Sequence, residues 1–171
     1  MDALAFPPLL TRLLKIECDY DDGNGIDFEP HSEFMAPAEA QRWFHAWTGN
    51  AVADASPYRI FGQDGTGGYV AFWLVRTGAD VLQQPIVFFG SEGELGVVAR
   101  DFLDYLWLLA GRYGPYEATA YPIEQRTPDA EFAAFAIAHA PDRRKSVAEV
   151  VAAAQEEFPS FVADVQKLCG Y

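Results

Sequence analysis

Three short apolar segments follow one another within residues 58–89, and turn-forming residues separate them. The first two, 58–62 and 68–75, are joined by the sequence QDGTG, and the third covers 85–89. Short runs rich in aromatic and β-branched residues between glycine-containing turns are typical of strands. Glycine is common in hairpin turns because it adopts positive φ angles without a steric penalty. The sequence therefore predicts consecutive strands at the centre of the fold.

Helical patterns lie on both sides of these strands. Residues 97–110 are apolar nearly all round, which predicts a helix buried on more than one side. Earlier in the chain, Pro37 is expected to begin a helix that ends at Gly49. Later, Thr127-Pro128 and the capping box Ser146-Val-Ala-Glu149 predict helix starts. We expect one α+β domain over 1–171, with a mostly antiparallel sheet flanked by helices and a helical C-terminal extension over 127–169.

The charge of the chain limits its partners. The 171 residues carry a formal net charge of −13. A field of this sign repels phosphate backbones and anionic lipids, so direct binding to nucleic acid or to a membrane is disfavoured. It favours a basic protein partner, whose approach it accelerates. The alternative is that the charge serves solubility alone.

The same sequence points to the cytoplasm. Cys18 and Cys169 lie near opposite ends and outside any CxxC motif, which favours two free thiols in a reducing compartment. The first ten residues, MDALAFPPLL, lack the basic start and continuous apolar core of a signal peptide. No apolar run reaches the length of about 18 residues that a transmembrane helix needs.

Acidic residues gather in 17–39, which holds eight Asp and Glu and no Lys or Arg. The spacing does not fit a calcium-binding EF-hand loop, because the sixth position from Asp19 is Asn24 and the twelfth is Pro30. We interpret the segment as a solvated turn or short hairpin that offers a surface to a partner. The candidate partner-binding residues, which include a second acidic patch and one tryptophan, are Asp19, Asp21, Asp22, Asp27, Glu29, Glu92, Glu94 and Trp73.

Motifs for catalysis or cofactor binding are not found in the sequence. The glycines after residue 61 lack the Gly-Lys-Ser/Thr of a phosphate-binding loop, and Ser91 is not in a GxSxG elbow. The three histidines have no metal-binding spacing. We therefore expect no catalytic residue, no metal site and no cofactor. The basic run Arg143-Arg144-Lys145 is interpreted as a solvated loop.

The middle of the chain resembles the SUKH superfamily, which includes a fungal cell-wall-synthesis-regulator domain and many bacterial immunity proteins. The resemblance covers about residues 35–110. It rests on an aromatic helix ending in Thr48-Gly49-Asn50, then YRIFGQDGTGGYVAFW, then PIVFFGSEGELGVVARDFLDYLWLL. It implies an α+β fold without enzyme activity and, for a bacterial member, an immunity protein that neutralises a toxin, often a nuclease or deaminase.

Three hypotheses for the function remain open at this point. The first is a non-enzymatic cytoplasmic domain, of immunity or regulatory type, that binds a basic protein such as a nuclease-type toxin. The second is a carboxylate-dependent enzyme, which a carboxyl of raised pKa in a pocket would favour. The third is a sensor of a small ligand or peptide, which an apolar cleft lined by Trp73 or Trp107 would favour.

Overall fold

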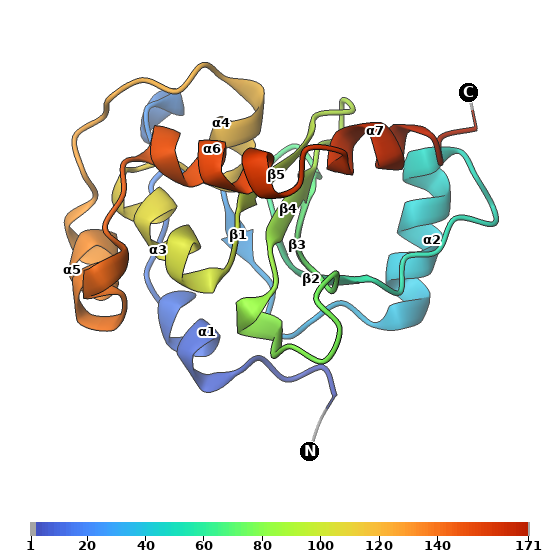
Figure 1. The fold of residues 1–171 in the computed structure, drawn as a ribbon, viewed down its shortest axis with the longest axis horizontal. Coiled ribbons are helices and arrows are strands. Elements are labelled where there is room, and N and C mark those ends of the chain that lie inside the picture. Colours follow the sequence, from blue (N-terminus) through green and yellow to red (C-terminus); the bar gives the residue numbers. More distant parts are fainter. Residues whose placement is uncertain (1–2, 171) are drawn as a thin grey trace.

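A computed structural model describes residues 3–170 and shows a five-stranded antiparallel sheet between layers of helices (Figure 1). The strands pair in chain order from β1 to β5, so each connection is to a neighbour. The strands are β1 (Glu29–Pro30), β2 (Tyr58–Gln63), β3 (Tyr69–Trp73), β4 (Ile86–Phe89) and β5 (Leu95–Ala99). The predicted α+β class with an antiparallel sheet is confirmed.

Seven α-helices surround the sheet in the described part of the chain. They are α1 (Pro8–Leu13), α2 (Pro37–Thr48), α3 (Phe102–Ala110), α4 (Pro115–Ala120), α5 (Ala130–His139), α6 (Val147–Glu157) and α7 (Phe161–Gln166). Figure 1 shows α2 on one side of the sheet and α1, α3 and α5 on the other. No helix of the described residues is long and apolar enough to span a membrane.

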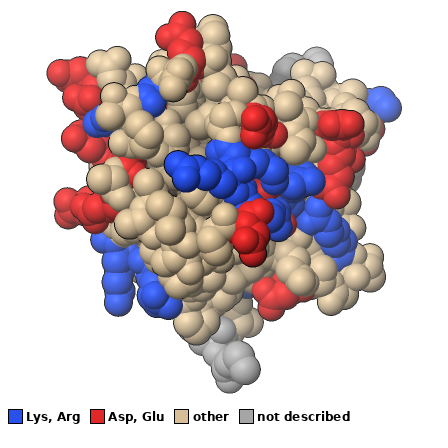
Figure 2. Space-filling view, turned by 60° about the vertical axis from the view of Figure 1, so that its left-hand side comes forward, with Lys and Arg blue, Asp and Glu red and all other residues tan. Residues whose placement is uncertain are grey.

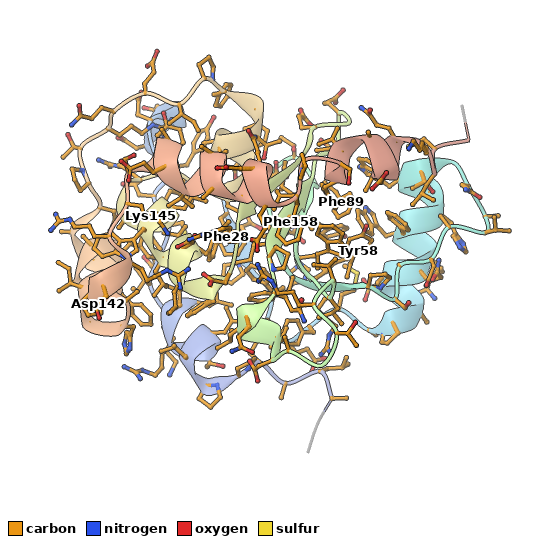
Figure 3. The ribbon with its side chains drawn as sticks, viewed as in Figure 1. Phe28, Tyr58, Phe89, Asp142, Lys145 and Phe158 are labelled. Carbon is orange, nitrogen blue, oxygen red and sulfur yellow. The ribbon has the colours of Figure 1, made fainter. Side chains whose placement is uncertain are left out.

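Each face of the sheet has its own core, because neighbouring side chains of a strand point to opposite faces. Phe72 and Phe88 lie in the core that α3 covers, whereas Val87 and Phe89 lie in the core that α2 covers. Figure 3 shows Phe89 on the α2 side of the sheet and Phe28 on the α3 side. Neighbouring aromatic residues of one strand, such as Phe88 and Phe89, therefore belong to different cores.

Helix α6 closes the edge of the sheet at β5. Its first part contributes Val147, Val150 and Val151 to the core beneath α3. Its last part contributes Ala154 to the other core, where α7 adds Phe161. An uncovered edge strand exposes unpaired backbone groups that invite pairing with another chain. The C-terminal helices therefore cover an edge and join the two cores.

The edge at β1 depends on a close approach of the Phe28 ring to the backbone of β2. The pairing of β2 with β3 shifts between Ile60 and Gly62. A Cβ atom at Gly62 would lie 2.3 Å from the Phe28 ring, which precedes β1. Glycine at this position therefore lets Phe28 pack over the sheet and places β1 beside β2.

Two predicted boundaries are wrong. The helix expected over 97–110 begins at Phe102, because the side chain of Asp101 accepts a hydrogen bond from the Asp104 N–H and forms the N-cap. Residues 97–99 belong to β5 instead. The helix expected to begin at Thr127-Pro128 begins at Ala130, because Asp129 caps it in the same way. Residues 90–94 therefore form a hairpin turn between β4 and β5 and do not lead from a strand into a helix.

Candidate functional site

Two acidic segments that are far apart in sequence meet at one end of the sheet. The turn between β2 and β3 contacts both of them. On one side, the Gly65 N–H donates to Asp27 Oδ1 at 2.8 Å. On the other side, the Ser91 hydroxyl lies 3.0 Å from the Thr66 hydroxyl, which places the β4–β5 turn with Glu92 and Glu94 beside it. The structure therefore brings Asp27, from the first predicted acidic patch, to the same end of the sheet as the turn with Glu92 and Glu94, and we call this end the acidic end.

The β2–β3 turn is itself organised by a buried acid. Asp64 is 1% exposed, and its carboxylate accepts hydrogen bonds from the Thr66 and Gly68 N–H groups and from the Thr66 hydroxyl. Aspartate commonly bonds backbone groups two residues further on and so fixes a turn. The acidic end thus rests on a turn whose shape is set by side-chain hydrogen bonds.

The loop with Asp19, Asp21 and Asp22 is exposed and unusually bent. Asp21 and Asp22 have positive φ angles of 46° and 49°, which Asp and Asn tolerate better than most residues. Asp21 also lies 3.4 Å from the Arg112 guanidinium. The segment holds no Lys or Arg of its own, but the fold brings Arg112 to it from 91 residues away along the chain.

Two predicted partner-binding residues, Glu29 and Trp73, lie in different parts of the structure. Glu29 is exposed on β1, opposite Gln63 and next to the β2–β3 turn, so it extends the acidic end. Trp73 lies at the other end of β3, where its ring packs 5.2 Å from Phe158 and 4.8 Å from Phe161 between ring centroids. The structure therefore places Trp73 in a helix-covered region, apart from the acidic residues.

Beneath the acidic end lies Glu117 of α4, which is 2% exposed. One of its carboxylate oxygens accepts from the Asp27 N–H and the other from the Gly114 N–H, so the side chain links α4 to the acidic segment. Burial raises the pKa of Glu117, although these hydrogen bonds act in the opposite direction. Both oxygens are occupied by backbone donors, as expected for a structural carboxylate.

We expect Glu117→Gln to lower the free energy of unfolding by about 1–3 kcal/mol below pH 4, because both oxygens of a protonated carboxyl can still accept a hydrogen bond, whereas an amide NH₂ cannot accept from the backbone N–H that faces it. A pKa raised by folding stabilises the protein below the unfolded pKa, and this contribution is lost as pH rises through the folded pKa. The advantage of the wild type should therefore shrink as pH rises from about 4. Urea unfolding at a series of pH values, with the exposed Glu156→Gln as control, measures this, and an advantage that widens with pH would contradict it.

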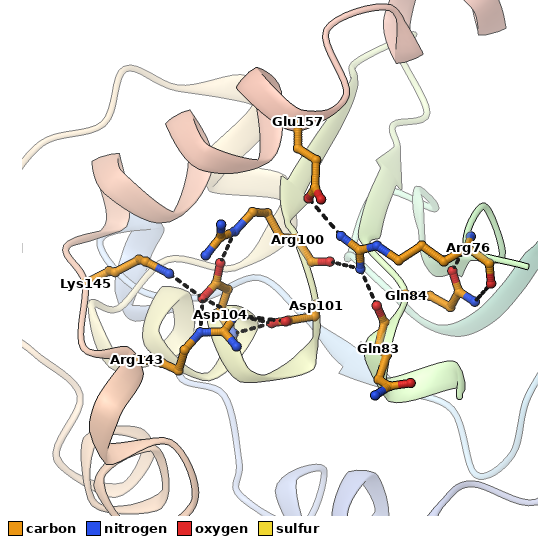
Figure 4. A network of polar contacts seen from close by, with 9 residues as sticks. All are labelled: Arg76, Gln83, Gln84, Arg100, Asp101, Asp104, Arg143, Lys145 and Glu157. Carbon is orange, nitrogen blue, oxygen red and sulfur yellow. Dashed lines mark hydrogen bonds and ion pairs between the residues drawn. The ribbon is translucent and has the colours of Figure 1, made fainter. Parts of the chain in front are cut away.

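A second polar cluster surrounds Asp104, which is fully buried at the first turn of α3 (Figure 4). Arg143 and Lys145 each place a nitrogen 2.8 Å from Oδ1, and Arg100 places its Nε 2.8 Å from Oδ2. Arg143 also contacts Asp101 at 2.8 Å. Burial alone raises the pKa of Asp104, but the hydrogen bonds from these three cations outweigh it and leave the pKa below its ordinary value.

This cluster corrects the interpretation of the basic run as a solvated loop. Arg143 and Lys145 are anchored on Asp104, so they fix the segment that leads into α6. In Figure 2, Lys and Arg side chains gather in the middle of the view with acidic side chains beside them. No sequence signal indicates that the basic run contacts Asp104, because Arg143 and Lys145 are 39 and 41 residues from it along the chain.

Burial raises the pKa of the Cys18 thiol to about 12, and a protonated thiol is a poor nucleophile. Cys18 and Cys169 are both free. Within residues 3–170, no group of three or more His, Cys, Asp or Glu is placed to hold a metal ion. The expected absence of a metal or cofactor stays a prediction.

Comparison of the chain with family models, with curated proteins and with solved structures gives no match.

Proposed function

We propose that this protein is a non-enzymatic, cytoplasmic protein-binding domain, of immunity or regulatory type, that binds and neutralises a basic partner such as a nuclease-type toxin. The observation that carries the proposal is the convergence of two separate acidic segments at one end of the sheet. The proposed contact residues are Asp19, Asp21, Asp22, Asp27, Glu29, Glu92 and Glu94. The resemblance to the SUKH superfamily supports the same class of function.

Two exposed tyrosines add to the case for a protein partner. Tyr20 is 55% exposed within the acidic loop. Tyr121, which is 48% exposed, lines a polar hollow together with Asp21. Tyrosine is enriched in protein interfaces because it combines a large apolar ring with a polar tip. Acidic side chains beside exposed tyrosines offer electrostatic steering and apolar contact on one surface.

The carboxylate-enzyme hypothesis receives less support from the same region. It would be favoured by a carboxyl group of raised pKa that faces a hollow. Glu117 has the raised pKa, but it is almost fully buried and both of its oxygens accept backbone hydrogen bonds. A substrate would have to displace those bonds. We therefore propose binding rather than catalysis at the acidic end.

The test is capture of partners with a variant in which Asp19, Asp21 and Asp22 are replaced by Asn. Asparagine tolerates the positive φ angles of the loop, so the fold should be retained. The matched control replaces three exposed acids of the C-terminal helices, Glu131→Gln, Glu156→Gln and Asp164→Asn, which removes the same charge elsewhere. We expect a basic protein to be retained by the wild type and the control and to be depleted from the loop variant. Equal retention by all three would contradict the proposal.

A further inference from the structure

A largely apolar groove of about 480 Å³ lies beside Trp107, where the start of α6 faces α5. Its lining combines apolar residues from α3, α5 and α6 with the segment between α4 and α5. Ile137 on its wall is 53% exposed, although it is large and apolar. The volume falls in the range of about 300–1,000 Å³ that is typical of small-molecule sites.

The walls of the groove are held in place by polar contacts. The Trp107 indole N–H donates to the Ala140 carbonyl at 2.9 Å, which fixes the ring. The Arg126 guanidinium donates to the carbonyls of Gly25 and Arg112 at 2.8 and 2.9 Å, which fixes the segment between α4 and α5. A hollow with fixed walls binds a ligand at a lower cost in conformational entropy than one that must be ordered.

Arg144 stands at the rim of this groove without a carboxylate partner among the residues described. Its two neighbours, Arg143 and Lys145, are anchored on Asp104. Arg144 itself is exposed, and its Cζ lies 5.6 Å from the centroid of the Trp107 ring. The Asp104 cluster thus holds the backbone on both sides of Arg144 and leaves its guanidinium beside the apolar floor.

The charge around the groove is positive in a protein whose net charge is −13. Arg126, Arg144 and Lys145 line it, and Glu124 is the one acidic residue among the lining residues. Arg126 and Lys145 are committed to carbonyls and to Asp104, so Arg144 is the cation best able to meet a ligand. A guanidinium offers paired N–H donors that match a carboxylate.

We propose that this groove binds a small amphipathic carboxylate, with its apolar body against Trp107 and Ile137 and its carboxylate on Arg144. The groove shares Glu124, Gln125 and Arg126 with the polar hollow that Asp21 and Tyr121 line, so the two sites are neighbours. The groove would let the protein bind an organic acid as well as a protein, in accordance with the sensor hypothesis raised from the sequence.

The experiment titrates the full chain with octanoate, octan-1-ol and octylammonium, followed by ¹H–¹⁵N NMR. We expect saturable shifts of the Trp107 indole and of the amides of Ile137 and Ser146 with octanoate. Octanol should bind about five- to tenfold more weakly, and octylammonium more weakly still, because neither forms the charge-assisted hydrogen bond. The absence of saturable shifts with octanoate would overturn the proposal.

Two variants and one control locate the binding. Arg144→Gln should weaken octanoate about five- to tenfold and leave octanol unchanged. Ile137→Glu places a carboxylate on the wall at an exposed position, so it should weaken octanoate without unfolding the chain. The control Arg42→Gln removes an exposed arginine from α2 and should change neither affinity. Octanoate binding that is insensitive to both groove variants would overturn the assignment.

Discussion

Replacing Phe89 with alanine is expected to lower the free energy of unfolding by about 3–5 kcal/mol. The side chain is fully buried on β4. Its ring centroid lies 4.9 Å from that of Tyr58, 5.2 Å from that of Trp47 and 5.3 Å from that of Trp43. The substitution would leave a cavity among rigid rings that cannot collapse to fill it, which is the condition for a large loss.

Urea unfolding monitored by tryptophan fluorescence and by circular dichroism measures this effect. Val52→Ala is the matched control, because Val52 is 87% exposed and its truncation should change the unfolding free energy by less than about 0.5 kcal/mol. A loss below about 1 kcal/mol for Phe89→Ala would mean that the aromatic core between α2 and the sheet is not packed as described.

Asp104→Ala is expected to cost about 3 kcal/mol of unfolding free energy, because it leaves the charges of Arg100, Arg143 and Lys145 without their shared partner. The side chains of the three cations are 22–33% exposed, so water offsets part of the loss. The control is Asp164→Ala, which removes an exposed partner of Lys167 and should have an effect below about 0.5 kcal/mol.

The ion pairs of Asp104 also predict how the effect of Asp104→Ala on the free energy of unfolding depends on pH. A pKa lowered by folding stabilises the protein above the unfolded pKa of about 3.9, and this contribution is lost as pH falls through the folded pKa. The difference in unfolding free energy between the wild type and Asp104→Ala should therefore shrink below about pH 4. A difference that is small at pH 7, or that grows in acid, would contradict the role assigned to Asp104.

The strands could be predicted from the sequence where the signals are local. The segments 58–62 and 85–89 are close to the observed β2 and β4, because glycine and aspartate mark the adjoining turns. Strand β5 was missed because its residues, Leu95–Ala99, run directly into an apolar helix, and apolar residues alone do not separate the two. The signals that mark the boundary are Val97-Val98, which are β-branched, and Asp101, which caps the helix.

The candidate sites depend on contacts that sequence spacing does not encode. The acidic residues of both patches could be identified in the sequence. That Asp27 and the β4–β5 turn lie at the same end of the sheet depends on their contacts with Gly65 and Thr66. The ion pair between Asp21 and Arg112 and the anchoring of Arg143 on Asp104 join distant segments. Trp107 was recognised as a possible cleft residue, whereas the role of Arg144 depends on where its neighbours are held.

The central claim is that the acidic end binds a basic protein, and the association rate constant of a captured partner at increasing salt tests it most directly. Exposed charges are screened beyond about 8 Å at physiological ionic strength, so we expect the association rate of the wild type to fall as salt rises. Substitution of Asp19, Asp21 and Asp22 by Asn should slow association and flatten this salt dependence, whereas the control with three neutralised C-terminal acids should keep it. Identical rates and salt dependences for the wild type and the Asn variant would contradict the claim.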